Sequence, residues 1–359
     1  MLILSIDTSC DETAVAIGQG RKILANEVYS QILLHQQWGG VVPSIAKKAH
    51  EEKIDLVLET CLKKFYRGRG ALFSSQLKKD FFAACFRQIN YIAVTQGPGL
   101  AIALEVGIKK AKELAEKYHK KLLAINHLEG HIYSVFAQNS QGNPSHKIEF
   151  PLLAVIVSGG HTELILMKKH LHYEILGSTL DDAVGEALDK AAKTLGLGYP
   201  GGPIIEKLSQ EVKNVDTYHF PRPMWQDQSL NFSYSGLKTA FYYYLRHLNE
   251  AEKNQQLKQL ASSFQEAAFA VLIKKTQTAI KQTKVKTIVV GGGVIANKRL
   301  RLLLRLMAKK NNLKLIFPPY YYLVGDNAAM IAVAAYFHAR QHRFISDINK
   351  LDRLPRMSL

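Results

Sequence analysis

The sequence contains little cysteine and has no long apolar run. Its 359 residues include three cysteines, Cys10, Cys61 and Cys85, whose spacing fits neither a disulfide framework nor a cysteine-based zinc site. No apolar stretch approaches the roughly 20 residues that a membrane-spanning helix needs. The apolar residues 2–6 lack a preceding basic segment and are followed by acids, so we expect a first β-strand there and not a signal peptide. These absences favour a soluble protein of the reducing cytoplasm, with no membrane partner.

Acidic residues are scarce relative to basic ones. The chain has 47 Lys and Arg against 30 Asp and Glu, a formal net charge of +17. Such a field attracts nucleic acid, an anionic membrane surface or an acidic ligand, although a solvated lysine-rich surface is the simpler alternative. Residues 63–90 are basic and irregular, and we expect them to form an insertion on the surface.

Two halves of the chain begin in the same way. "SIDTSCDETAVAI" and "VIVSGGHTELIL" are each an apolar run, a polar turn and a second apolar run, which predicts two strands joined by a tight turn. Between and after them, strands alternate with stretches of helical periodicity, which predicts an α/β protein. The expected helices cover residues 43–65, 182–194, 203–213, 253–282 and 326–340.

Three glycine-rich turns could bring the backbone close to an anion. They are "VSGGH" at 157–161, "YPGGP" at 199–203 and "GGGVIAN" at 291–297. Each alone is typical of a plain tight turn. Two of them follow apolar strands directly, where free backbone N–H groups suit a phosphate, and this favours a nucleotide cleft between two lobes.

Three acids near the second of these turns are spaced along one predicted helix. Asp182, Glu186 and Asp189 stand at i, i+4 and i+7 and would share one helical face. A solvated acidic stripe is one interpretation. The other is that these carboxylates accept hydrogen bonds from ribose hydroxyls.

The segment "NHLEGH" contains two histidines four residues apart. His127 and His131 could belong to a zinc protease, to another metal site or to an ordinary helix. In the protease motif a glutamate directly follows the first histidine. Here Glu129 stands two residues on, about 200° around a helix from His127. The protease is therefore excluded, and the pair remains suited to metal binding through a mixed set of ligands.

Taken together, the motifs of the chain resemble the bacterial TsaD family of tRNA adenosine threonylcarbamoyltransferases. The family is related to the Kae-type (OSGEP-like) subunit of the KEOPS complex. The matching segments lie between residue 4 and about residue 335, in family order: "IDTSCDETAVAI", "GGVVPSIAKKAH", "TQGPGL", "NHLEGHI", "VSGGHTELI", "DDAVGEALDKAAKTLGLGYPGGP", "FSYSGLKTA", "GGGVIANKRLR" and "GDNAAMIA".

The resemblance implies a two-lobed actin-like ATPase fold of the sugar kinase, Hsp70 and actin type. Each lobe would be a βββαβα unit with a mixed sheet. We expect residues 1–125 and 318–359 to form one lobe and residues 126–317 to form the other. The nucleotide and the metal ion would lie in the cleft between the lobes.

The resemblance also implies an activity and its site. The threonylcarbamoyl group of threonylcarbamoyl-AMP would pass to N6 of the adenine on the 3′ side of the anticodon, in tRNAs reading ANN codons, with release of AMP. One divalent ion would be bound, Fe²⁺ ahead of Zn²⁺. The implied metal ligands are His127, His131 and Asp326, and the implied adenylate contacts are Val157, Ser158, Gly159, Gly160, His161, Asp189, Gly202, Glu206 and Asn297.

The general base and the partners are less closely defined. Asp11 and Glu12 are candidates for the base, which the sequence does not identify. The family implies a paralogous TsaB-like subunit and a TsaE-like ATPase as partners.

Two other functions fit the same fold. A kinase or ATPase would need a γ-phosphate site and a catalytic aspartate but no histidine pair, and it would turn over ATP without tRNA. A non-catalytic scaffold of a tRNA-modifying complex would have no need of the metal and adenylate positions that this sequence retains.

Overall fold

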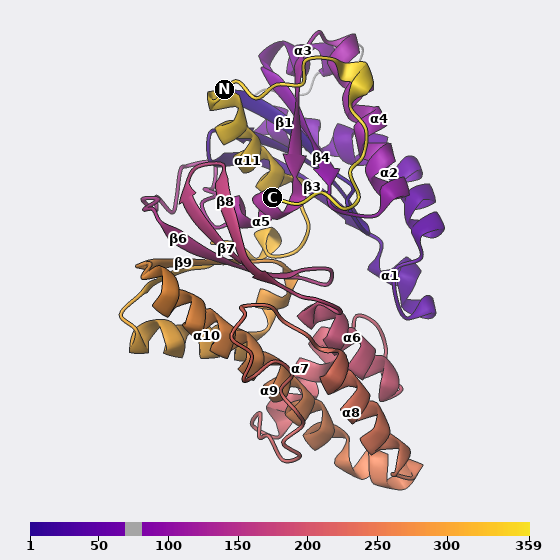
Figure 1. Ribbon diagram of the computed structural model, residues 1–359. Coiled ribbons are helices and arrows are strands. Elements are labelled where there is room, and N and C mark those ends of the chain that lie inside the picture. Colours follow the sequence, from indigo (N-terminus) through magenta and orange to yellow (C-terminus); the bar gives the residue numbers. More distant parts are fainter. Residues whose placement is uncertain (69–80) are drawn as a thin grey trace. The chain divides into compact units, whose positions relative to one another are not determined.

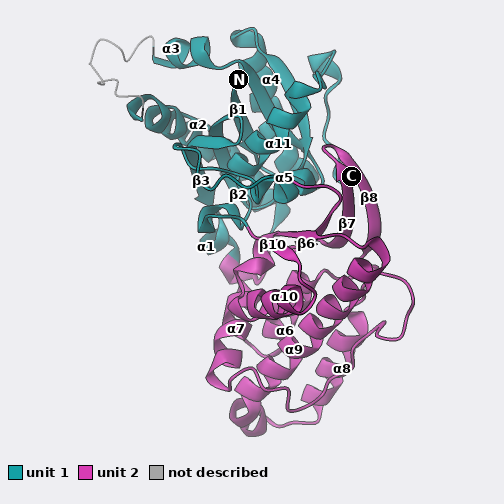
Figure 2. Ribbon diagram, turned by 90° about the vertical axis from the view of Figure 1, so that its left-hand side faces the viewer, with its two compact units in different colours: residues 1–35, 41–148, 318–359 teal, residues 36–40, 149–317 magenta. Residues whose placement is uncertain are grey.

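The computed structural model describes residues 1–68 and 81–359 and divides into two compact units (Figures 1 and 2). Unit 1 comprises residues 1–35, 41–148 and 318–359, and unit 2 comprises residues 36–40 and 149–317. Each unit contains one five-stranded sheet with both parallel and antiparallel neighbours. The predicted α/β architecture is therefore confirmed.

Unit 1 is built on the first five strands of the chain. The strands are β1 (Leu2–Asp7), β2 (Glu12–Gln19), β3 (Lys22–Ser30), β4 (Tyr91–Gly97) and β5 (Lys121–Asn126). The helices are α1 (Ile32–His35), α2 (Pro43–Arg67), α3 (Phe81–Gln88), α4 (Ala101–Lys117), α5 (His127–Ser134) and α11 (Ala328–Arg340), with short 3₁₀ turns η4 (Tyr321–Leu323) and η5 (Ile348–Lys350).

Both faces of the unit 1 sheet are covered, and β1 shows how. Leu4 and Ile6 belong to the hydrophobic cluster formed with α2 and α4. Ser5 points to the opposite face, because side chains alternate along a strand. There its hydroxyl donates a 2.6 Å hydrogen bond to the carbonyl oxygen of Ala328. Helix α11, close to the C-terminus, therefore packs on the face away from α2 and α4.

Unit 2 repeats this plan with the next five strands. The strands are β6 (Leu152–Val157), β7 (Thr162–Lys169), β8 (His172–Ser178), β9 (Thr287–Gly291) and β10 (Lys314–Ile316). The helices are α6 (Val184–Thr194), α7 (Gly201–Glu211), α8 (Ser235–Arg246), α9 (Glu250–Thr283) and α10 (Lys298–Lys310), with 3₁₀ turns η1 (Gln36–Trp38) and η3 (Gly293–Ala296).

The two sheets have the same strand order. It is β3-β2-β1-β4-β5 in unit 1 and β8-β7-β6-β9-β10 in unit 2. In each, the first strand along the chain pairs antiparallel with the second and parallel with the fourth. The similarity of the two halves in the sequence is thus a duplicated topology.

The segment predicted as an irregular insertion is partly helical. Helix α2 continues to Arg67, and α3 places Phe81, Cys85 and Phe86 in the core of unit 1. The prediction for residues 63–90 is therefore wrong at both ends, because the apolar spacing of "FFAACF" forms a buried helical face beside a basic stretch. Residues 69–80 lie outside the described part of the chain.

The boundary between the units also differs from the predicted one. Unit 1 continues past residue 125 to Ile148, since α5 packs against α11. The returning segment begins at Pro318, where we expected it. Strand β8 and helix α8 had no clear signal in the sequence.

No described helix is both long and apolar enough to cross a membrane. The two longest, α2 and α9, carry charged residues along their length.

A buried lysine on α9 provides a test of packing in unit 2. Lys275 is 2% exposed, and its ammonium group donates to the carbonyl oxygens of Asp227 (3.0 Å) and Ser229 (2.6 Å). Lys275→Met leaves both acceptors without their donor, so we expect a loss of about 1–3 kcal/mol in the free energy of unfolding. Denaturant titration measures this change in the free energy of unfolding. Lys281→Met, at an exposed position of the same helix, is the control; equal effects of the two substitutions would contradict the assignment.

Candidate functional site

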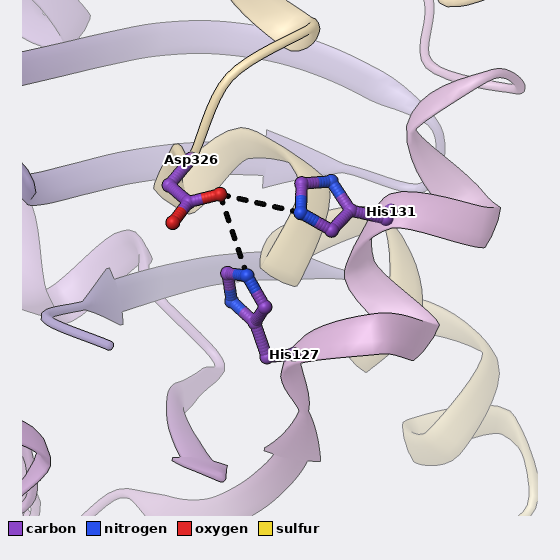
Figure 3. A group of neighbouring side chains, drawn as sticks. All are labelled: His127, His131 and Asp326. Carbon is purple, nitrogen blue, oxygen red and sulfur yellow. Dashed lines mark ion pairs between the residues drawn. The ribbon is translucent and has the colours of Figure 1, made fainter. Parts of the chain in front are cut away.

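Three side chains of unit 1 converge on one point (Figure 3). His127 and His131 lie on α5, and Asp326 lies in the loop before α11. Oδ1 of Asp326 is 3.4 Å from Nε2 of His127 and 3.2 Å from Nε2 of His131. One ligand atom from each residue lies within 4.8 Å of the other two. The predicted ligand set is thus brought together by segments about two hundred residues apart in the sequence.

Two capped helix starts place these side chains. Asn126 ends β5 and caps α5 by accepting a 2.8 Å hydrogen bond from the backbone N–H of Leu128. Asn327 caps α11 in the same way, at 2.9 Å from the N–H of Met330. Because α5 and α11 pack together, the residues beside the two caps, His127 and Asp326, are held close to each other.

The polar atoms at this point fit a cation. Both ring nitrogens of His131 are buried and have no hydrogen-bond partner among the described residues, although Nε2 lies near the Asp326 carboxylate. A histidine lone pair and a carboxylate oxygen repel each other in a buried setting unless a proton or a cation lies between them. Imidazole nitrogens with a carboxylate oxygen are a usual donor set for Zn²⁺ and Fe²⁺. The group could therefore hold a metal ion.

Two further residues orient His127. The Ser9 hydroxyl lies 3.1 Å from Nδ1 of His127, and Oδ2 of Asp7 lies 3.6 Å from the same nitrogen. Both residues are buried: Asp7 is the last residue of β1, and Ser9 lies two residues after it. Contacts to Nδ1 of this kind leave Nε2 to face the metal position. The sequence analysis did not predict a role for Asp7 or Ser9. The one feature that could have indicated it is their position at the carboxyl end of an apolar strand.

Two of the three side chains, Asp326 and His131, already carry the charge that a cation requires, whereas the His127 ring would have to release a proton to bind one. Burial alone would lower the pKa of His127, but the Asp326 carboxylate outweighs burial and raises it. Burial would raise the pKa of Asp326, but His127 outweighs it and lowers that pKa well below the ordinary value. For His131 burial dominates, and its pKa is lowered. The carboxylate is therefore ionised and the His131 ring neutral.

The two candidate bases lie close to this group. Asp11 is buried, and Glu12 begins β2. Burial, followed by the carboxylates of Asp11 and Asp326, raises the pKa of Glu12 well above its ordinary value.

Glu129 faces away from the metal position, as its place on the helix predicts. Its Oε2 lies 2.8 Å from Nε2 of His338 on α11. The glutamate therefore contacts α11, the packing partner of α5, and does not face the point between His127 and His131.

The residues predicted to contact an adenylate all belong to unit 2. The turn after β6 is closed by hydrogen bonds from the Ser158 N–H to the carbonyl of His161 (2.8 Å) and from the His161 N–H to the Ser158 hydroxyl (3.0 Å). A Cβ added at Gly159 or Gly160 would meet no atom of the described residues within 4 Å. The backbone of both glycines is therefore open to a ligand.

The glycine turn after β9 lies beside this one. Strands β6 and β9 are parallel neighbours, with Ile156 opposite Gly291. Gly292 has φ 97° and ψ 155°, and a Cβ there would stand 2.3 Å from the carbonyl oxygen of Val157. Only glycine fits such a conformation and approach. Both turns therefore lie at one sheet edge of unit 2.

Three predicted contact residues hold the starts of helices. Oδ1 of Asp189 accepts from the N–H groups of Gly201 (2.7 Å) and Gly202 (3.1 Å), at the start of α7. Glu206 accepts from the N–H of Lys298 (2.7 Å) at the start of α10. Asn297 caps α10 at the N–H of Leu300 (3.0 Å) and donates to Gln265 (2.8 Å). Helix N-termini held in this way favour a phosphate.

The predicted acidic stripe does not form as expected. Asp182 precedes α6, and its carboxylate pairs with Lys190 (2.5 Å) and Lys238 (2.6 Å). Glu186 also pairs with Lys190, at 2.8 Å. Of the three acids, Asp189 alone contacts a glycine turn among the described residues.

A family model described as "TsaD: tRNA N6-adenosine threonylcarbamoyltransferase" matches residues 22–333 of the chain. A protein of that name from Thermosipho africanus is 42% identical over 361 residues, covering 100% of both chains. Another from Staphylococcus haemolyticus is 45% identical, covering 94% of this chain and 91% of its own.

Solved structures show the same fold at low sequence identity. HypF from T. kodakarensis aligns with a TM-score of 0.55 and 13% identity, over 95% of this chain and 48% of that one. A full-length HypF in its phosphate- and nucleotide-bound form aligns with a TM-score of 0.55 and 12% identity, over 95% and 55% of the two chains. These likenesses confirm the predicted fold class.

Glu163 on β7 predicts a pH dependence of stability. One carboxylate oxygen is buried without a hydrogen-bond partner among the described residues, and burial raises the pKa of the group to about 7 from 4.5. Between these values the unfolded chain has released the proton while the folded chain keeps it, so stability falls as pH rises. Glu163→Gln removes this dependence. Relative to wild type, the variant should gain up to about 3 kcal/mol between about pH 5 and about pH 8.

Unfolding titrations at several pH values measure this gain. Glu174→Gln, on the exposed part of the neighbouring strand β8, is the matched control. A stability difference between the Glu163 variant and wild type that stays constant with pH would contradict the prediction.

The convergence of three ligands predicts one divalent ion per chain. After loading with Fe²⁺ or Zn²⁺ and desalting, elemental analysis should find about one equivalent in wild type and none in His127→Ala/His131→Ala. His247→Ala, at an exposed position after α8, should retain the ion. Undiminished metal in the double variant would place the ion elsewhere.

Proposed function

The chain belongs to the TsaD family of tRNA N6-adenosine threonylcarbamoyltransferases, and from this premise we propose its substrates. The donor is threonylcarbamoyl-AMP. The acceptor is N6 of the adenine on the 3′ side of the anticodon in tRNAs that read ANN codons, and AMP is released. The observation that carries the proposal is the convergence of His127, His131 and Asp326 in a chain of this family.

The proposed metal ligands are these three side chains, with Fe²⁺ as the ion and Zn²⁺ as the alternative. A bound cation would supply Lewis acidity toward the carbamoyl carbonyl and would grip the threonyl hydroxyl and carboxylate. The protein itself keeps the Asp326 carboxylate ionised and fixes the ring of His127 through Ser9. Holding the carbamoyl carbon near a weakly nucleophilic amine can contribute about 7–11 kcal/mol to lowering the barrier.

The proposed adenylate site is the glycine-turn edge of unit 2. Residues 157–161 would approach the nucleotide with their backbone, and Gly202 would offer the start of α7. Asp189, Glu206 and Asn297 fix the helix starts around it. The reaction transfers no phosphoryl group. The site therefore has to bind the AMP leaving group and does not need a residue that activates a nucleophile toward phosphorus.

The proposed attraction of tRNA rests on the net charge of +17. Some of the lysines are already paired with acidic side chains and are less available for binding RNA phosphates. Lys63 and Lys64 pair with Glu59 and Glu27, and Lys110 pairs with Asp55 and Glu113, so their charges are partly neutralised. We propose that the remaining field positions the anticodon arm through its phosphates. A TsaB-like subunit, a TsaE-like ATPase and a cytoplasmic location complete the proposal by analogy with the family.

One reaction tests the proposed function. Purified protein, threonylcarbamoyl-AMP and unmodified tRNA, with the expected partners added, should yield N6-threonylcarbamoyladenosine on nucleoside analysis. His131→Ala should slow the transfer by about 100-fold or more, because loss of a metal ligand costs at least as much as loss of its supporting contacts. His247→Ala is the control. ATP hydrolysis without a tRNA product would instead favour a kinase or ATPase of the same fold.

A further inference from the structure

Three consecutive tyrosines stand just before the metal-site aspartate. Tyr320, Tyr321 and Tyr322 lie in the loop that leads to Asp326, and η4 contains the last two of them. Tyr321 is 81% exposed and Tyr322 is 43% exposed. A large planar side chain left this open makes no contribution to a core, so its presence calls for another explanation.

Two of the three rings, those of Tyr320 and Tyr322, are held in place. Tyr320 and Tyr322 stack, with ring centroids 5.6 Å apart and planes inclined by 7°. The Tyr320 hydroxyl donates a 2.8 Å hydrogen bond to the carbonyl oxygen of Asn143. The next residues, Leu323 and Val324, are buried and anchor the loop. The Tyr322 ring is thus held in a fixed orientation, and Tyr321 precedes it on the same anchored backbone, which lowers the entropic cost of binding a planar partner.

A second pair of exposed tyrosines, Tyr242 and Tyr243, differs from the loop tyrosines in ring arrangement and in position. Tyr242 and Tyr243 on α8 are 48% and 55% exposed, but their planes are inclined by 66°, an edge-to-face contact. They belong to unit 2, whereas the metal-site residues belong to unit 1. This pair therefore shares the exposure of Tyr321 and Tyr322 but lacks both the parallel stacking that Tyr322 makes with Tyr320 and the place close to Asp326 in the chain.

The distance along the chain limits what the loop tyrosines can touch. Tyr321 stands five positions before Asp326, and five chain steps span at most about 18 Å. A ligand that places one group at Asp326 therefore has its neighbouring groups within reach of the rings. For an RNA loop those groups are unpaired bases, which proteins commonly bind by stacking on aromatic side chains.

We propose that Tyr321 and Tyr322 form a stacking platform for an unpaired base of the tRNA anticodon loop. The proposal rests on the proposed function, because the base in question is a neighbour of the adenine to be modified. The platform binds and positions the RNA without contact to the reacting atoms. Stacking on a ring tolerates any base, so the platform fixes the position of the loop and does not read its sequence.

Binding of an isolated anticodon stem-loop tests the platform. We expect the Kd, measured by fluorescence anisotropy, to rise about 5- to 100-fold in Tyr321→Ala/Tyr322→Ala, the range for loss of a base–aromatic stack. The rings carry no charge, so the dependence of log Kd on log salt should keep the wild-type slope. Tyr321→Phe/Tyr322→Phe keeps the rings and should bind as wild type does. Tyr242→Ala/Tyr243→Ala is the matched control and should also bind normally.

A series of stem-loops with one abasic nucleotide each locates the stacked base. One of them should bind wild type weakly and lose no further affinity in the alanine variant, since the two changes remove the same contact. An unchanged unfolding transition and metal content show that the variant folds. Binding by the alanine variant equal to wild type, or an equal loss for every abasic loop, overturns the platform alone. A wild-type protein that binds no stem-loop and modifies no tRNA, even with the partners present, overturns the proposed function and the platform with it.

Discussion

The candidate metal site depends on one interaction, the approach of the Asp326 carboxylate to two buried histidines. That approach requires α5 and α11 to pack closely, and Gly130, between the histidines, makes it possible. A Cβ at Gly130 would stand 2.9 Å from Cδ1 of Ile331 and 3.0 Å from Cγ of Met330. The small residues of α11 likewise allow the helix to pack closely on the sheet, where the Ser5 hydroxyl donates a hydrogen bond to the carbonyl oxygen of Ala328. The glycine in "HLEGH" is therefore a packing requirement of the candidate metal site.

The sequence predicted the parts of this site that are local and failed at those that are not. The spacing of His127 and His131 fixed their common helical face, and the position of Glu129 excluded the protease. Asp326 lies about two hundred residues away, and no periodicity links it to them; only the resemblance to a family suggested it. Asp7 was not predicted as a site residue, because a single acid at the end of a strand forms no recognisable sequence motif. The helix at 81–88 was hidden for the opposite reason, since the basic residues before it masked a short apolar face.

The glycine-turn edge of unit 2 shows why an acidic residue is hard to interpret from sequence. Asp189 was either a surface charge or a ribose contact, and the structure adds a third role, since it holds the first N–H groups of α7. Glu206 and Asn297 likewise secure α10. A residue that caps a helix start also sets the direction of the neighbouring N–H groups. Substitution there changes stability and ligand geometry together, so loss of binding alone would not distinguish a contact from a cap.

The loop from Pro318 to Asn327 is anchored at its middle and at its end. Leu323 and Val324 are buried, and Asn327 caps the helix that follows. After the buried pair the chain directs Asp326 toward the two histidines, and before it Tyr321 is left exposed. The spacing between the ion position and the proposed platform is therefore set by an anchored backbone and not by flexible side chains. Transfer to an aromatic amine needs such fixed spacing, because small displacements of the reacting atoms cost large factors in rate. A short rigid loop achieves it with fewer ordered residues than two separate elements would need.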